Sequence, residues 1–156
     1  ELCLPYAVDV GLFGKAGAAP SETQWKIFTA AMPLIKERLV FLREAPEKLG
    51  YLFSEPAVPA AEEFIPKKAD LTQAIVLLRQ GRELVKPMAE AADDVTAESL
   101  IKEWAEKNGV KLGDLMMPLR AAITGARVSP PLFGSLRILG AAKSLERVDR
   151  ALAVLN

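Results

Sequence analysis

The sequence contains no histidine and only one cysteine, Cys3, among its 156 residues. Without histidine the chain cannot form a Ser-His-Asp triad, a Cys-His pair or an imidazole site for a metal. A single cysteine excludes an internal disulfide bond and a cysteine-rich zinc site. Carboxylates and lysines alone can support catalysis, so these absences make an enzyme less expected without excluding one.

Long apolar runs are missing as well. No uninterrupted apolar stretch approaches the ~20 residues that are needed to cross a bilayer. The first residues, ELCLPYAVDVG, lack the basic and apolar regions of a signal peptide. We therefore expect no membrane association and a cytoplasmic location. Because the chain begins at Glu1 and not at methionine, we expect it to be a processed or excised part of a longer gene product.

The net charge is zero, from 20 basic and 20 acidic residues, but the two signs are unevenly distributed. From Gly109 to Asn156 there are seven basic and three acidic residues, so the acidic excess lies in the first part of the chain. A basic tail on an acidic body favours an anionic partner for the tail. Chance fluctuation explains so small an excess equally well, and both interpretations stay open.

Signatures of nucleotide chemistry are absent. The chain has neither the G-x-x-x-x-G-K-[ST] phosphate loop nor the G-x-G-x-x-G fingerprint. The acidic pairs Glu62-Glu63 and Asp93-Asp94 are adjacent in sequence, and adjacent helical residues do not face each other. We interpret these pairs as solvated helix starts, where acids favour the helix dipole. Trp25 and Trp104 lie on apolar stripes and are expected to pack in cores.

Capping residues, and apolar residues at steps of three and four, predict a chain of helices without a sheet. A first helix is predicted from Ser21, kinked at Pro33 and closing near Pro46 and Gly50. Further helices are expected over residues 70–87, 96–107, 111–124, 130–139 and 144–155, with Asp70, Thr96 and Ser144 as N-caps. The fold class predicted from these patterns is all-α.

The segment EPAVPAAEEFIPKK, residues 55–68, carries three prolines and two charge pairs. Such a composition is typical of a linker or a helix junction. The sequence therefore predicts two small helical-bundle lobes in tandem, residues 1–69 and residues 70–156.

The turn after the predicted helix 111–124 combines basic, polar, stiff and apolar residues. Single-stranded RNA recognition needs this combination, because hydrogen-bond donors meet base edges and phosphates while apolar surfaces support unstacked bases. A proline-stiffened loop also loses little conformational entropy on binding. The candidate binding residues in this region are Arg120, Thr124, Arg127, Ser129, Pro130 and Leu132.

Two alternatives accompany this interpretation. A helical protein-interaction module with a basic C-terminal docking face explains the same composition, and composition alone favours it over nucleic acid. Arg38, at the edge of the first apolar stripe, can lie along the helix and pair with Glu37 or Glu44. Judged from its neighbours alone, Arg38 is a structural residue.

Several motifs in order resemble one family. PLRAAITG at residues 118–125, SPPLF at 129–133 and LERVDRAL at 145–152 are similar to the C-terminal end of bacterial glutamyl-tRNA synthetases. PLIKERLVFLREA, residues 33–45, resembles a helix earlier in the same region. The resemblance implies two all-helical domains that grip the anticodon arm of glutamate tRNA.

The resemblance also implies what is missing from this chain. The family's catalytic H-I-G-H-like and K-M-S-K-S-like stretches are absent, so we expect no catalysis and no cofactor in the chain itself. The parent enzyme, a class I glutamate–tRNA ligase, uses ATP and magnesium. The implied partners are glutamate tRNA and the N-terminal catalytic domain of the same enzyme, in a monomer.

Individual roles follow from the motif matches. The arginine of the family's E-R stretch, which reads the cytosine at the third anticodon position, matches Arg38. The arginine of P-L-R and the S/T-P-P-L loop, which contact the first two anticodon bases, match Arg120, Ser129, Pro130 and Leu132. Thr124 and Arg127 lie in the same turn and join the expected site.

Overall fold

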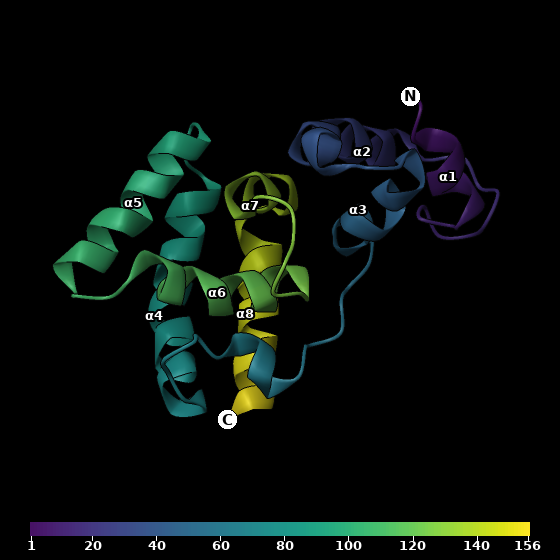
Figure 1. Ribbon diagram of the computed structural model, residues 1–156. Helices are drawn as coiled ribbons and strands as arrows, with labels where there is room; N and C mark the ends of the chain where they lie inside the picture. Colours follow the sequence, from purple (N-terminus) through teal and green to yellow (C-terminus); the bar gives the residue numbers. More distant parts are fainter. The chain divides into compact units, whose positions relative to one another are not determined.

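The computed structural model describes all 156 residues, and its eight α-helices and three short 3₁₀ helices confirm the predicted all-α class without any strand (Figure 1). The chain divides into two compact units, Glu1–Pro56 and Ala57–Asn156. No helix combines the length and the apolar character that a membrane span requires.

The first unit holds three α-helices around an aromatic centre. They are α1 (Leu4–Asp9), α2 (Glu22–Ile35) and α3 (Ala45–Phe53), with 3₁₀ helices η1 (Lys36–Arg38) and η2 (Leu42–Glu44) between the last two. The ring of Phe13 meets the rings of Phe28 and Phe53 edge-on, at centroid distances of 5.7 Å and 5.4 Å. Trp25 stacks on Phe28 at 6.0 Å, so it contributes to the core as predicted.

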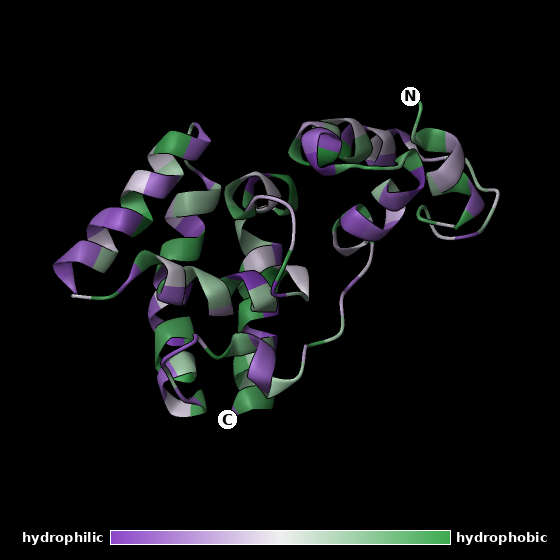
Figure 2. Ribbon diagram, in the orientation of Figure 1, coloured by the Kyte–Doolittle hydropathy of each residue, from purple (hydrophilic) through white to green (hydrophobic).

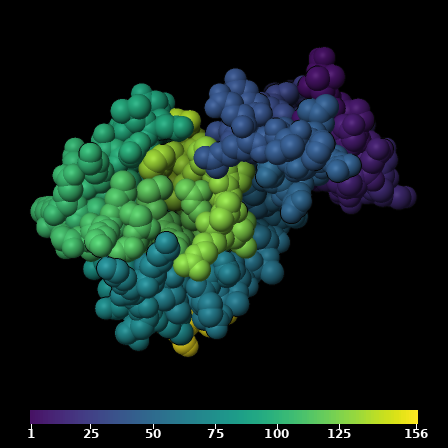
Figure 3. Space-filling model, in the orientation of Figure 1, coloured from purple at the N-terminus to yellow at the C-terminus, as the bar shows by residue number.

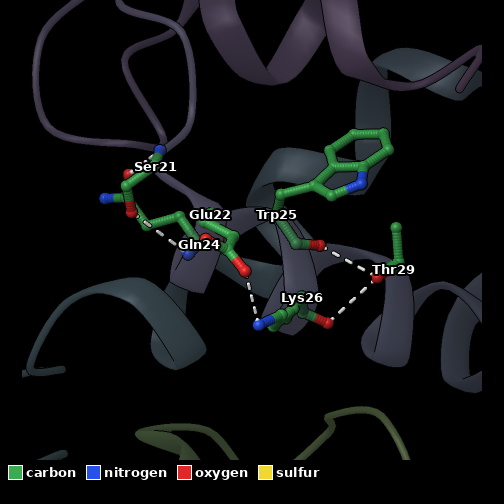
Figure 4. Close-up of polar contacts among 6 residues, drawn as sticks. All are labelled: Ser21, Glu22, Gln24, Trp25, Lys26 and Thr29. Atoms are coloured by element: carbon green, nitrogen blue, oxygen red, sulfur yellow. Dashed lines mark hydrogen bonds and ion pairs between the residues drawn. The ribbon is translucent and has the colours of Figure 1, made fainter.

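Helix α2 begins where the sequence predicts a helix start, at Ser21, with a capping box. The Ser21 hydroxyl accepts the Gln24 backbone N–H at 3.2 Å, while the Gln24 side chain accepts the Ser21 N–H at 2.9 Å (Figure 4). One turn later Lys26 pairs with Glu22 at 2.7 Å. The reciprocal bonds satisfy two backbone donors that a helix start otherwise leaves unpaired.

The predicted extent of this first helix is wrong. The α-helix ends at Ile35, two residues after Pro33, and tightens into η1. Proline has no backbone N–H and its ring crowds the preceding turn, which weakens the helix around it. The apolar stripe that continues through Leu39 and Leu42 therefore lies on non-α-helical backbone.

The second unit is built on two antiparallel helices, α4 (Leu71–Ala89) and α8 (Ala141–Leu155), with α6 (Leu112–Thr124) crossing them (Figure 1). Arg82 on α4 forms a bidentate ion pair with Asp149 on α8, at 2.5 Å and 2.9 Å. Helix α8 carries both hydrophobic and hydrophilic residues, as expected for a helix with one buried and one exposed face (Figure 2). The largest fully buried apolar side chains of this unit are Phe64, Leu78, Met88, Ile101, Leu115, Leu119, Ile123 and Leu132.

Two shorter helices, α5 (Asp94–Lys107) and α7 (Leu132–Leu139), complete the second unit. Trp104 on α5 packs against the core, as predicted. The segment 57–69 also belongs to this unit, because the fully buried Phe64 of η3 (Ala61–Phe64) lies in its core. Ile65 packs against the same core.

Helix ends in the second unit follow the local signals in most places. Asp70 is the N-cap of α4 as predicted and forms a capping box with Gln73, and Gly125 ends α6 with φ of 76°. The predicted Thr96 cap is wrong, because α5 begins at Asp94 and the Asp93 carboxylate accepts the Thr96 N–H at 2.8 Å. That hydrogen bond lowers the pKa of Asp93.

The predicted Ser144 cap is also wrong. Helix α8 begins at Ala141, directly after α7, and Ser144 is fully buried inside it. The junction is the single residue Gly140, with φ of 82° and ψ of 161°. Residues that carry a Cβ rarely adopt this backbone conformation. Because this residue turns the chain alone, no linker and no side-chain cap are needed.

Candidate nucleic-acid interface

Helix α6 presents Arg120 at the start of the predicted binding turn. Leu115 and Leu119 are fully buried and fix the helix in the core, whereas Arg120 is half-buried. After Gly125 the chain reverses and returns through Ser129 to α7. The segment that follows α6, yellow-green in Figure 3, reaches the surface of the second unit.

Arg120 braces this turn. Its Nη1 donates to the Ser129 hydroxyl at 2.9 Å and to the Pro130 carbonyl at 2.9 Å, and it lies 3.4 Å from the Ser129 carbonyl. The Ser129 hydroxyl in turn donates to the Pro130 carbonyl at 3.1 Å. One cationic group therefore holds the Ser-Pro backbone in place, and hydrogen bonds from a charged donor are among the stronger ones.

Thr124 and Leu132 are brought to the same turn but are not exposed. The Thr124 hydroxyl lies 2.8 Å from the Arg120 carbonyl and 3.1 Å from the Ala126 carbonyl, and the residue is 5% exposed. Leu132 is 1% exposed and belongs to the core cluster. These two side chains hold the backbone of the turn and offer almost no surface themselves.

Arg127 is exposed and connects the turn to the segment that follows η3. Its Nη2 donates to the Ile65 carbonyl at 2.8 Å and lies 3.3 Å from the Met117 sulfur. The turn is thus held by two arginines, Arg120 from the helix side and Arg127 from within the loop. Such double support lowers the entropy cost of ordering the loop on binding.

One charged residue of this region was not expected from the sequence. Arg147 on α8 is 1% exposed, and its Nη1 donates to the Ile123 carbonyl at 2.7 Å. A cation at the C-terminal end of α6 is favoured by the helix dipole. The available signal was its spacing, three residues after Ser144 and four before Ala151, both of which are buried.

Arg38 belongs to the other unit and is described apart from these residues. It is exposed and ends η1, so it lies on a 3₁₀ turn and not on the α-helix that the sequence predicted. The structure therefore brings Arg120, Thr124, Arg127, Ser129, Pro130 and Leu132 together within the second unit, and Arg38 projects from the first. No group of three or more metal-ligating side chains occurs in the chain.

Comparison with known proteins gives the turn a context. The family model described as "Anticodon binding domain" matches residues 1–152. A glutamate–tRNA ligase of Treponema denticola is 41% identical over 168 residues, covering 97% of this chain and 33% of that protein. A glutamate–tRNA ligase of Treponema pallidum strain Nichols is 44% identical over 138 residues, covering 88% of this chain and 26% of that protein.

A solved structure has the same fold. The crystal structure of a glutamate tRNA ligase from Elizabethkingia meningosepticum, in complex with its amino acid, matches with a TM-score of 0.69 at 20% identity. The match covers 99% of this chain and 29% of that one. The chain thus spans about a third of the length of the ligases it matches. Since the family model extends over nearly the whole chain, the protein belongs to the anticodon binding domain family and corresponds to that part of glutamate–tRNA ligases.

Proposed function

We propose that this chain binds the anticodon arm of glutamate tRNA as part of a glutamate–tRNA ligase. Family membership supports the class of ligand, and the observation that carries the proposal is the braced turn around Ser129 and Pro130. A turn held by Arg120 before the RNA arrives provides fixed positions for unstacked bases. Preorganisation of this kind raises affinity because less order has to be created on binding.

Within the second unit, the first two anticodon bases are the proposed ligands of the turn. Arg120 and Ser129, both half-buried, form the contact surface, and Arg127 adds an exposed positive charge beside it. Pro130 is itself buried and contributes by stiffening the backbone of the turn. Thr124 and Leu132 act by holding the backbone, since both are buried. Arginine and hydroxyl donors suit base edges and phosphate oxygens alike.

Arg38 is the proposed reader of the third anticodon base. Its exposed position on η1 leaves the side chain at the surface, and a guanidinium can donate to the O2 and N3 acceptors of cytosine. On this proposal each of the two compact units, Glu1–Pro56 and Ala57–Asn156, is an anticodon-binding lobe and contributes an arginine to recognition.

The remaining proposals concern the whole enzyme. The whole ligase would be a cytoplasmic monomer. Its N-terminal catalytic domain would use ATP and magnesium and would be a partner of this chain. The chain has no nucleotide-binding signature and no histidine, so we expect no aminoacylation from it. Pyrophosphate exchange above background in a clean preparation would contradict that expectation.

The test is a titration of the chain with glutamate tRNA and with versions changed at each anticodon base. Replacing Arg120 or Arg38 by alanine should weaken binding by about 1–3 kcal/mol, the range of a good bidentate base contact. Arg38→Ala should also lose the preference for cytosine at the third position, and Arg38→Gln should reduce it.

Lys143 provides the matched control, because it is exposed on α8 and offers a charge without a proposed base. Lys143→Ala should weaken binding uniformly across anticodons and in a salt-dependent way. If Arg38→Ala and Lys143→Ala lower affinity equally for every anticodon, Arg38 is only a surface charge and its proposed role is wrong.

A further inference from the structure

Arg147 is the one arginine of the chain that is almost completely buried, at 1% exposure. Removing a guanidinium from water costs several kcal/mol, and a buried charge is often replaceable by an apolar side chain of similar volume without loss of stability. Stability alone therefore does not explain why a charged group occupies this place between α6 and α8.

The hydrogen bond of Arg147 ends next to the binding turn. Its Nη1 donates to the carbonyl of Ile123 at 2.7 Å, and Ile123 immediately precedes Thr124. That carbonyl is among the last four of α6, which have no partner within the helix. Arg147 thus secures the last turn of α6 from a different helix.

The same turn controls the loop. The Thr124 hydroxyl contacts the carbonyls of Arg120 and Ala126, which lie on either side of the reversal at Gly125. Arg120, one turn earlier on α6, holds Ser129 and Pro130. A continuous set of polar contacts therefore leads from the buried Arg147, through the end of α6, to the exposed loop.

We propose that Arg147 is a positioning residue for anticodon binding, which fixes the end of α6 so that Arg120 and the Ser129–Pro130 turn keep their binding geometry. The proposal rests on the function proposed above, because it assigns Arg147 a role in that same site. Arg147 touches no RNA in this scheme. It acts through Ile123 and Thr124, and its loss should disturb the loop more than the fold.

Two substitutions distinguish a positioning role of Arg147 from a contribution to core packing. Arg147→Met keeps an apolar stem of similar length and removes every donor, whereas Arg147→Lys keeps one cationic donor that can reach a carbonyl. The control is Ile101→Val on α5, a fully buried residue whose helix makes none of the hydrogen bonds described for the loop. It measures how much a modest loss of core packing alone changes binding.

The readouts are affinity for the glutamate anticodon stem-loop and hydrogen exchange of the backbone amides in residues 124–129, with unfolding by urea measured in parallel. Arg147→Met should bind about tenfold more weakly, on the order of one lost base contact, and its loop amides should exchange faster. Arg147→Lys should recover most of both properties. Ile101→Val should bind like the wild type even if it unfolds more readily.

The proposal is overturned if Arg147→Met binds the stem-loop and exchanges its loop amides like the wild type. It is also overturned if Ile101→Val, compared at equal stability, loses as much affinity as Arg147→Met. If Arg147→Met fails to fold, Arg147→Lys decides. It should fold and keep most of the affinity and of the loop protection, and a folded lysine variant that loses affinity while its loop amides stay protected overturns the proposal, because the loss then does not act through the loop. Failure of the proposed function is a different result, since the wild-type chain itself then shows no preference for the glutamate anticodon stem-loop.

Discussion

Gly81 on α4 lies against the side chain of Leu119 on α6, and replacing it by alanine gives a sharp test of the packing. A Cβ at this position would lie 2.7 Å from Cδ1 and 2.8 Å from Cγ of Leu119. Both residues are buried, and Leu119 is 0% exposed, so any movement of its side chain takes place within the packed core. The added methyl group must therefore displace the core or separate the helices.

Two opposing effects determine how much Gly81→Ala changes the free energy of unfolding. Alanine is favoured over glycine inside a helix by about 0.8–1 kcal/mol, whereas overpacking a core costs typically about 1–3 kcal/mol. We expect Gly81→Ala to lower the free energy of unfolding by about 0.5–2 kcal/mol, measured by urea titration. Gly113→Ala is the control, because Gly113 is exposed in the first turn of α6 and its Cβ would meet nothing within 4 Å. That variant should be neutral or more stable than the wild type.

A double-mutant cycle identifies the contact. Leu119→Ala alone should cost about 2–5 kcal/mol through the cavity it leaves. In that background Gly81→Ala should become stabilising, since its methyl group enters the vacated space, and the coupling should exceed about 1 kcal/mol. If Gly81→Ala instead matches Gly113→Ala in the wild-type background, the close approach of α4 and α6 is not as tight as described and the reasoning fails.

Three further predictions concern caps and ion pairs. Asp93→Ala should lower the free energy of unfolding by about 1 kcal/mol in chemical denaturation, because it removes an N-cap. Ser144→Ala should leave that free energy unchanged, because Ser144 caps no helix. Equal losses of stability in the two variants would contradict this prediction. The pKa of Asp149 is lowered chiefly by its hydrogen bond from Arg82. The ion pair therefore stabilises the fold at neutral pH, and this contribution declines as the pH falls below 3.8, the ordinary pKa of the carboxyl. Asp149→Asn should accordingly cost less than about 1 kcal/mol at pH 7, since the pair is largely exposed, and the gap to wild type should close in acid-unfolding curves; a constant gap would refute the assignment. Arg137, 2.6 Å from a carboxylate of α5, should contribute a similarly small stabilisation that 1 M salt reduces in thermal melts; salt-independence would contradict it.

Helix starts were predictable from the sequence where the signal is local. At Ser21 and Asp70 the donor and the acceptor of each capping box lie three residues apart, so the pattern is complete in the sequence. The end of α2 was not predictable in the same way, because the three-four apolar spacing continues past Ile35 onto residues that do not form α-helix. Where periodicity and the effect of Pro33 disagree, only the packing of the first unit decides.

The binding turn was predictable in composition but not in its internal contacts. The sequence placed Arg120, Ser129 and Pro130 in one region, yet the bonds from the guanidinium to the Ser-Pro backbone depend on how the chain reverses. The burial of Arg147 and the close contact at Gly81 depend on which helices pack together, since each joins residues distant in sequence. Local spacing can place Arg147 on the buried face of its helix, but it does not identify the tertiary neighbours that Arg147 and Gly81 meet.

The single-residue junction at Gly140 has a consequence for how this domain can vary in evolution. An α-helix turns by about 100° per residue, so starting α8 one residue earlier or later in the sequence after this junction would turn its buried face away by that angle. Val148 would leave the core and Arg147 would lose the Ile123 carbonyl. The match to the Treponema denticola ligase extends over 168 residues, more than this chain contains, so relatives do differ in length. Insertions and deletions should therefore fall in the loop before α2 or in the segment between α3 and η3, and the spacing from the Ser-Pro-Pro turn to Arg147 should stay fixed.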